Sequence, residues 1–195
     1  MNYLAHLCLT DDVAERVVGN LVGDFVKGAP EGRFPPVMVE GIRLHRAIDR
    51  FTDRHECVQR AFARIDPARR RYAGVAVDMA FDHFLARDWC RNDPDGFREA
   101  RERAYALLQA HREALPTSAQ RVIDTMARDD WWASYADLDG IASALARMSA
   151  RLSRPNALAE TAHDIERGYD GLATDFAAFW PAARAFAAAQ QDARM

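Results

Sequence analysis

The sequence predicts an all-α protein built as a single-domain helical bundle over residues 1–195. Apolar residues recur at helical spacing, for example at Ile141, Leu145, Met148 and Leu152. Alternation of polar and apolar residues, which is typical of strands, does not persist anywhere, and no internal repeat is visible. A chain of 195 residues, of which 49% are hydrophobic, is long enough to bury one core, and its composition does not require two domains.

The first half of the chain contains four predicted helices after a short apolar entry segment at residues 2–9. These helices cover about 12–26, 36–53, 56–65 and 72–90. Asp12 and Glu15 resemble a capping box at the start of the first helix, and Gly28 ends it. Pro36 suits the first turn of the next helix, where its missing N–H costs nothing. Pro67 and the arginines that follow it predict an exposed basic turn.

The second half continues as helices, which we expect mainly to provide packing. The predicted ranges are 97–113, 117–128, 140–152 and 155 onward, with a break near Pro181. Between them, Trp131, Trp132 and Tyr135 form an aromatic cluster. Packing is the simplest role for this cluster, and the alternative is that it lines a groove.

Composition excludes several classes of protein. The net charge of −3 provides no global field to attract nucleic acid, and no run of about 18 apolar residues predicts a membrane span. The start lacks the basic region of a secretory signal, and the three cysteines have no Cys-x-x-Cys spacing, so we expect a cytoplasmic protein. Residues 40–71 nevertheless contain nine arginines against five acids, which could attract an acidic partner.

The helix predicted over residues 36–53 carries the clearest candidate site. His45 and Asp49 lie one turn apart, and Arg43, Arg46 and Arg50 form a cationic stripe beside them. An imidazole and a carboxylate bordered by arginines suit a metal-assisted reaction on a phosphate ester. The alternative is a solvated helix face with ordinary ion pairs between successive turns.

Other imidazoles and carboxylates gather in the first half. The full set is His6, Asp24, His45, Asp49, Asp78, Asp82 and His83. Asp78 and Asp82 share an apolar stripe, where a carboxylate is costly unless it is paired or binds a cation. They could also form a buried network with arginines that has no catalytic role. Such a mixture of donors suits manganese, magnesium or iron better than a thiolate zinc site.

Five segments resemble the acyl carrier protein phosphodiesterase family, and helix order agrees along the chain. The segments are Asn2-Tyr-Leu-Ala-His6, Gly19-Asn-Leu-Val-Gly-Asp-Phe-Val-Lys-Gly28, Phe34-Pro-Pro36, Gly41-Ile-Arg-Leu-His-Arg-Ala-Ile-Asp-Arg-Phe-Thr-Asp53 and Asp78-Met-Ala-Phe-Asp-His-Phe-Leu85. The resemblance implies a phosphoric diester hydrolase that removes 4′-phosphopantetheine from a serine of holo acyl carrier protein and leaves the apo protein. It also implies an all-helical fold related to the HD phosphohydrolases and dependence on manganese or a similar divalent ion.

The resemblance also implies roles for particular residues. The expected metal ligands are Asp24, His45, Asp82, His83 and His6, and the expected catalytic residues are Asp24, His45, Asp49 and Asp78. The expected contacts with substrate or carrier protein are Arg43, Arg46, Arg50, Asn20 and Lys27. An HD site has adjacent His-Asp ligands, whereas this chain has the order Asp82-His83. We therefore leave open which of these two side chains binds metal.

On this interpretation, residues 1–92 hold the metal site, and residues 93–195 provide packing and a substrate groove. Two other functions remain open from the sequence. One is a metal-dependent phosphohydrolase acting on a nucleotide or another small phosphoester, for which the arginine stripe would be incidental. The other is a helical module that binds acyl carrier protein without catalysis.

Overall fold

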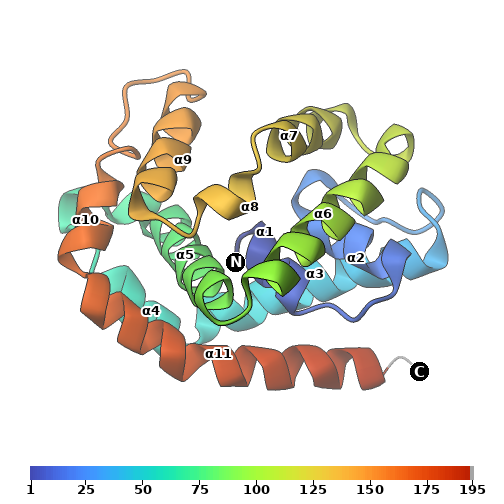
Figure 1. Ribbon diagram of the computed structural model, residues 1–195, viewed down its shortest axis with the longest axis horizontal. Helices are drawn as coiled ribbons and strands as arrows, with labels where there is room; N and C mark the ends of the chain where they lie inside the picture. Colours follow the sequence, from blue (N-terminus) through green and yellow to red (C-terminus); the bar gives the residue numbers. More distant parts are fainter. Residues whose placement is uncertain (194–195) are drawn as a thin grey trace.

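A computed structural model describes residues 1–193, and within them the secondary structure consists of helices with no strand (Figure 1). The first half comprises α1 (Tyr3–Cys8), α2 (Ala14–Leu21), the 3₁₀ helix η1 (Gly23–Phe25), α3 (Pro36–Arg54), α4 (Glu56–Ala63), η2 (Pro67–Tyr72) and α5 (Ala73–Asn92). The second half comprises α6 (Pro94–Ala110), η3 (Arg112–Ala114), α7 (Thr117–Arg128), α8 (Trp131–Ser134), α9 (Leu138–Ala150), α10 (Thr161–Arg167) and α11 (Tyr169–Asp192). The predicted all-α class is confirmed.

Several predicted boundaries differ from the structure. The entry segment is itself the helix α1, and α2 is shorter than predicted because the chain tightens into η1 after Val22. The capping box at Asp12 is wrong, because α2 begins after Val13 without a side-chain cap. The break at Pro181 is also wrong, since α11 continues through it. Buried Phe179 and Ala183 lie on either side of this proline, so packing outweighs the missing hydrogen bond.

Two glycines bring α2 and α3 into backbone contact. A Cβ atom on Gly19 would collide with the carbonyl oxygen of Met38, and one on Gly41 would collide with the carbonyl oxygen of Arg16. Only residues without a side chain allow this approach. The close packing fixes the position of α3 relative to α2 and so places His45 beside Asn20.

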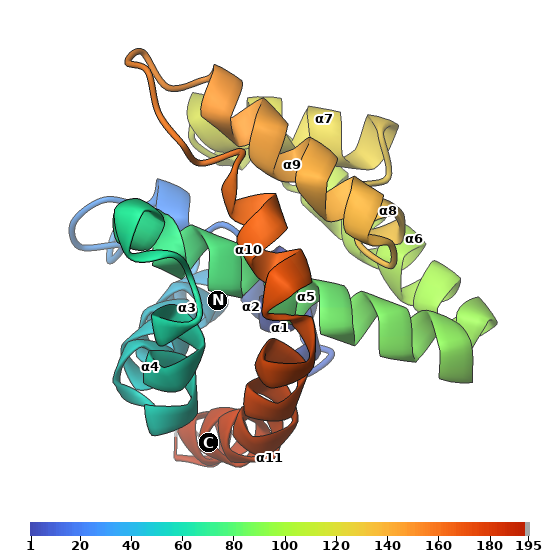
Figure 2. The same cartoon turned by 90° about the vertical axis from the view of Figure 1, so that its left-hand side faces the viewer.

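Helix α5 runs through the middle of the molecule. Ala76, Ala80 and Phe84, spaced one turn apart along it, are fully buried. In Figure 2, α7, α8 and α9 lie on one side of α5, and α4 and α11 lie on the other. Helix α1 packs directly against α5, which brings the start of the chain into the interior. Within residues 1–193, no helix is both long enough and apolar enough to cross a membrane.

Candidate metal centre

His45 occupies a buried position on α3 with its two ring nitrogens in different surroundings. Its Nδ1 lies 2.8 Å from the backbone carbonyl oxygen of Asn20. Because a carbonyl can only accept, Nδ1 must carry the proton, and in the neutral ring Nε2 then presents a lone pair. A Cβ atom on Gly23 would collide with this ring, so a glycine at the start of η1 is required for the arrangement.

His6, on α1, is held in a similar way. Its Nδ1 lies 3.0 Å from Oδ1 of Asn20. The amide nitrogen of Asn20 donates to the backbone carbonyl of His6 and to the Thr10 hydroxyl, so the amide oxygen faces the ring and accepts from Nδ1. Nε2 of His6 is buried and makes no hydrogen bond of acceptable geometry within the described residues. Asn20 therefore orients both imidazoles, one through its side chain and the other through its backbone.

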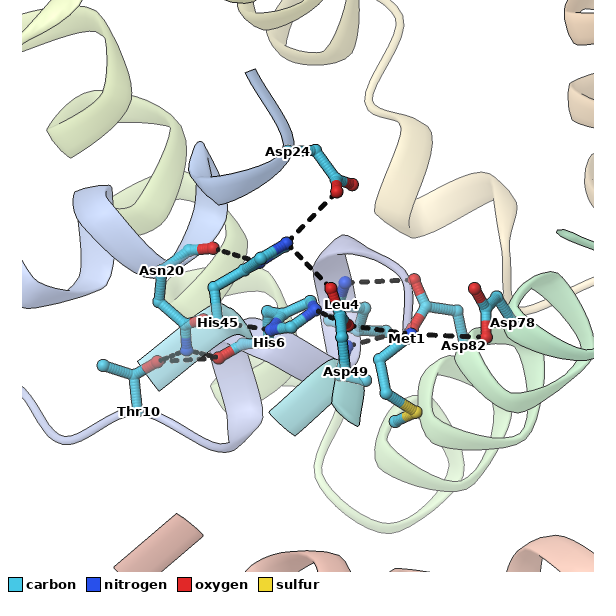
Figure 3. Close-up of polar contacts among 11 residues, drawn as sticks. Met1, Leu4, His6, Thr10, Asn20, Asp24, His45, Asp49, Asp78 and Asp82 are labelled. Atoms are coloured by element: carbon cyan, nitrogen blue, oxygen red, sulfur yellow. Dashed lines mark hydrogen bonds and ion pairs between the residues drawn. The ribbon is translucent and has the colours of Figure 1, made fainter. Parts of the chain in front are cut away.

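Asp49, one turn after His45 on α3, joins the two rings (Figure 3). Its Oδ1 lies 3.2 Å from Nε2 of His6, and its Oδ2 lies 3.1 Å from Nε2 of His45. The rings themselves are stacked, with centroids 4.0 Å apart. One donor atom from each of His6, His45 and Asp49 lies within 4.8 Å of the others. These three residues form the cluster that we call the candidate metal centre.

The electrostatics of the candidate metal centre favour positive charge beside Asp49. With Nδ1 protonated on both rings, two lone pairs face a carboxylate, which is unfavourable without positive charge between them. Burial alone would lower the pKa of His45, but Asp24 and Asp49 outweigh it and raise the pKa to about 9. Burial and the nearby charge of His45 lower the pKa of His6 to about 4. A divalent cation could replace the proton on His45, so the residues fit a metal site.

Asp49 remains ionised despite its surroundings. Burial alone would raise the pKa of its carboxyl, but the interactions with the His45 imidazolium and the charged Met1 amino group outweigh burial and hold that pKa far below its usual range. The α-amino nitrogen of Met1 also lies 3.2 Å from Oδ1 of Asp49. The carboxylate is therefore available as an anionic ligand over the whole physiological pH range.

Asp24 and Asp78 lie at the edge of the candidate metal centre. Asp24, on η1, is 64% exposed at its side chain, and its Oδ1 lies 3.3 Å from Nε2 of His45. The hydrogen bond with His45 lowers the pKa of this carboxyl. Asp78, on α5, approaches only indirectly, because its Oδ1 lies 3.3 Å from the Met1 amino nitrogen. Burial raises the pKa of Asp78, and the Met1 amino group opposes this shift.

Asp82 is not part of the candidate metal centre, although we expected it to be a ligand. Its two oxygens accept hydrogen bonds from the backbone N–H groups of Leu4 and Ala5, at 3.0 and 2.9 Å. It thus caps the start of α1 from another helix and holds the helix that carries His6. Burial raises the pKa of Asp82 to about 7, although the two N–H donors oppose the shift.

His83, the other expected ligand on α5, faces a different part of the molecule. Its Nδ1 lies 2.8 Å from the backbone carbonyl of Tyr135, and its Nε2 lies 2.9 Å from the hydroxyl of Tyr169. The same hydroxyl accepts from Arg87 at 2.7 Å. One residue along a helix is a rotation of about 100°, so His83 cannot point the same way as Asp82. Both of its nitrogens are engaged by the second half of the chain.

The predicted arginine stripe is partly structural. Arg43 pairs with Glu31 at 2.5 Å, and Arg46 donates to the backbone carbonyls of Val26 and Gly28. Arg46 therefore holds the loop after η1. Arg50 is exposed and makes no ion pair among residues 1–193.

Two further residues expected to contact the substrate or carrier protein differ in exposure. Lys27 is exposed, but Asn20 is fully buried and cannot meet a docking protein. Its role as the residue that orients both imidazoles was not predicted. The signal available in the sequence was a polar residue beside Gly19, the glycine that brings α2 against α3.

Comparisons with known proteins agree on one family. A family model described as acyl carrier protein phosphodiesterase matches residues 1–183. Proteins named acyl carrier protein phosphodiesterase from Serratia proteamaculans and Escherichia coli O6:H1 are 37% and 39% identical, each over 93% of this chain and 94% of the relative. One from Yersinia enterocolitica is 37% identical over 93% of this chain and 95% of its own length. No solved structure matches the chain.

Proposed function

The chain belongs to the acyl carrier protein phosphodiesterase family, and on this basis we propose that it is a metal-dependent hydrolase of holo acyl carrier protein. In this proposal, it cleaves the phosphodiester between 4′-phosphopantetheine and a serine of the carrier protein and leaves the apo protein. The name shared by the relatives supports a phosphodiesterase that acts on the carrier protein. Dependence on metal and the identity of the product are our own inferences.

The observation that carries the metal proposal is the pair of imidazole nitrogens that face Asp49. The unpaired Nε2 of His6 and the Nε2 of His45 converge on one carboxylate, and the three donor atoms lie within 4.8 Å of one another. Asn20 anchors both rings at Nδ1, as protein groups outside the coordination sphere commonly do for metal-bound histidines. Two nitrogens and carboxylate oxygens suit manganese, with magnesium or iron as alternatives.

Charge supports the same proposal. A phosphodiester is an anion, and an approach to Asp24 and Asp49 alone would be repulsive. A divalent cation bound by His6, His45 and Asp49 would supply Lewis-acid stabilisation of the phosphate charge and would make water more acidic. The residues of the candidate metal centre would hold this cation, and Asn20 would keep their lone pairs directed at it.

The remaining roles follow from exposure. Asp24 is ionised, accessible and 3.3 Å from Nε2 of His45, so we assign to it the acceptance of the proton from the attacking water. Lys27 and Arg50 are exposed and provide positive charge for an acidic carrier protein. Contacts of this kind should weaken as salt is added. The engagement of Arg46 with the loop after η1 makes it a residue that supports Asp24 rather than a docking contact.

The test is an intact-mass measurement of holo acyl carrier protein after incubation with the protein and manganese, with and without a chelator. We expect loss of the whole phosphopantetheine group, prevented by the chelator and by Asp49→Asn. Asp53→Asn is the matched control, because Asp53 lies one turn further along α3 and is exposed. A carrier mass that stays unchanged with folded, metal-loaded protein would refute the proposal, and a screen of nucleotides and small phosphoesters would then follow.

A further inference from the structure

A small pocket lies between the start of the chain and the second half of the molecule. It has a volume of about 180 Å³, and its walls include Tyr3, Trp131, Ala144, Arg147, Met148 and Arg151. Tyr3 belongs to α1 and Trp131 to α8. Arg147 lies on α9, and Arg151 directly follows that helix. Figure 1 shows α8 next to α9, and Figure 2 shows both helices on the same side of α5. None of these residues has a role in the candidate metal centre.

Tyr3 nevertheless connects the pocket with that centre along α1. This residue lies one turn before His6 on α1. Burial raises the pKa of the Tyr3 hydroxyl, the charge of Asp24 raises it further, and the charge of Arg151 opposes the shift. Tyr3 therefore joins the wall of the pocket to the helix that carries His6. A ligand attached to a phosphate at the centre could extend into the pocket.

Two guanidinium groups in the pocket are available to an anion. Arg147 and Arg151 lie over the ring of Trp131, with their central carbons 5.6 and 5.9 Å from its centroid. Neither makes an ion pair with a carboxylate in the part of the chain that the structure describes. Stacking on an aromatic face leaves the N–H groups of an arginine free to donate to an oxyanion.

Two polar groups without partners lie behind the wall of the pocket. Nε1 of Trp131 and the hydroxyl of Tyr135 are buried and make no hydrogen bond within residues 1–193. The side chains of Asp129 and Asn2 approach these two groups without reaching hydrogen-bond geometry. Both atoms are shielded from the space inside the pocket, so the arginines and the apolar wall are the groups that a ligand would meet. The surfaces of Ala144 and Met148 complete an otherwise apolar wall.

We propose that this pocket binds the pantetheine arm of the substrate, with the phosphodiester end beside Arg147 and Arg151 and the arm along the apolar wall. The inference rests on the proposed function, because that function supplies this substrate. The pantetheine arm is an uncharged, extended chain with two amides, joined to an anionic phosphodiester. It therefore matches a pocket with an apolar wall and cationic side chains.

The size of the pocket favours a chain over a bulky ligand. Pockets for drug-sized molecules usually enclose roughly 300–1,000 Å³, and this one has about 180 Å³. It can therefore hold only a segment of the extended arm.

The first experiment measures binding of free pantetheine by calorimetry. Pantetheine has no phosphate, so the reading reports the pocket and not the candidate metal centre. Ala144→Trp fills the pocket from the buried face of α9, and Ala146→Trp adds the same group on the exposed face of that helix as a matched control. We expect the unmodified protein and Ala146→Trp to bind pantetheine, and Ala144→Trp to bind at least about tenfold more weakly.

Because Ala144 is buried and its replacement could prevent folding, Met148→Trp provides a second filling variant at a half-buried position. Helical content measured by circular dichroism identifies which variants are folded. Arg147→Gln and Arg151→Gln should weaken binding of 4′-phosphopantetheine more than binding of pantetheine. The proposal would be overturned if a folded filling variant bound pantetheine as tightly as the unmodified protein. It would also be overturned if the unmodified protein did not bind pantetheine at millimolar concentration.

A second experiment separates this inference from the proposed function. Each protein is assayed on holo acyl carrier protein and on bis(4-nitrophenyl) phosphate, a diester without the arm. Filling the pocket should lower kcat/KM for the carrier protein at least about tenfold relative to kcat/KM for the small diester. Unchanged cleavage of holo carrier protein by a folded filling variant would refute the pocket and leave the function standing. Failure of the unmodified protein to cleave holo carrier protein, with pantetheine still bound, would refute the function instead.

Discussion

His6 and His83 are buried to nearly the same extent, with exposed fractions of 1% and 3%, yet their surroundings differ in kind. Both nitrogens of His83 have hydrogen-bond partners, Tyr135 and Tyr169. In His6, only Nδ1 is anchored, and Nε2 faces the carboxylate of Asp49 beside a second imidazole. A histidine with both nitrogens satisfied stabilises the core, whereas one with a directed, unpaired lone pair is prepared to bind a cation.

The difference between His6 and His83 also shows how neighbouring protein groups select the tautomer of an imidazole. Asn20 accepts at Nδ1 of His6 through its side chain and at Nδ1 of His45 through its carbonyl. Both rings therefore direct Nε2 at the same point. Tyr169 offers His83 a hydroxyl that can donate or accept, so this ring needs no ion for its hydrogen bonding.

The largest expected effect comes from removing a residue of the candidate metal centre. His6→Gln or Asp49→Asn should lower manganese affinity by about 100-fold or more, because loss of a direct ligand should exceed the 10- to 100-fold typical of supporting residues. His83→Gln is the matched control and should change affinity by less than about threefold. Manganese titration followed by electron paramagnetic resonance measures both. Equal losses in His6→Gln and His83→Gln would erase the distinction between the two histidines.

The next effect should come from Asn20, which touches no metal in our proposal. Asn20→Ala removes the side-chain acceptor for His6 but keeps the backbone carbonyl that serves His45. Manganese affinity should fall by about 10- to 100-fold. Nitrogen-15 spectra should show a mixture of tautomers at His6 and a single tautomer at His45. An unchanged His6 tautomer in this variant would show that another group orients the ring.

His45 and His83 should also respond oppositely to pH in the metal-free protein. The pKa of His45 is raised from 6.5 to about 9, so its stabilisation is complete below pH 6.5 and is lost as pH rises to about 9. Burial lowers the pKa of His83, so the unfolded state binds a proton at this residue more readily than the folded state does. The protein therefore loses stability at His83 as pH falls below the ordinary histidine pKa. Since one pKa unit corresponds to about 1.4 kcal/mol, the melting temperature should fall by at least roughly 3 °C between pH 6.5 and 9.

His45→Gln tests this effect, because it should flatten the alkaline decline. Calorimetric melting curves of chelator-treated protein provide the measurement. Added manganese should remove the decline as well, since the metal takes the place of the proton. A decline that persists unchanged in His45→Gln would assign the alkaline titration to another group.

Much of the fold could be predicted because helical periodicity is a local property. The range of α7 matched its prediction, and α3 did so to within one residue. The contacts of the site depend instead on packing between distant segments. Asp49 and His45 were predicted together because they share a helix face, and His6 was recognised as a candidate. The convergence of His6 on Asp49 requires α1 to pack on α5, which periodicity does not encode.

Asp82 and His83 illustrate the opposite case. Both fall within a segment that resembles the family, and both are buried. The sequence pattern therefore could not show which of them binds metal and which only holds the surrounding helices in place. Only the structure shows that Asp82 caps α1 and that His83 meets Tyr169. A buried carboxylate has two outcomes, capping or coordination, and the choice depends on which backbone N–H groups reach it.

The smallest expected effect is also the most direct test of the difference between His6 and His83. Tyr169→Phe removes the hydroxyl that pairs with Nε2 of His83 and with Arg87. Loss of these bonds should cost about 1 kcal/mol, or roughly 2–4 °C in melting temperature, with manganese affinity unchanged. The change leaves His83 with one anchored nitrogen, as in His6, but with no carboxylate opposite. A new manganese site in Tyr169→Phe would mean that an unpaired imidazole alone suffices, and that Asp49 is not what distinguishes the candidate metal centre.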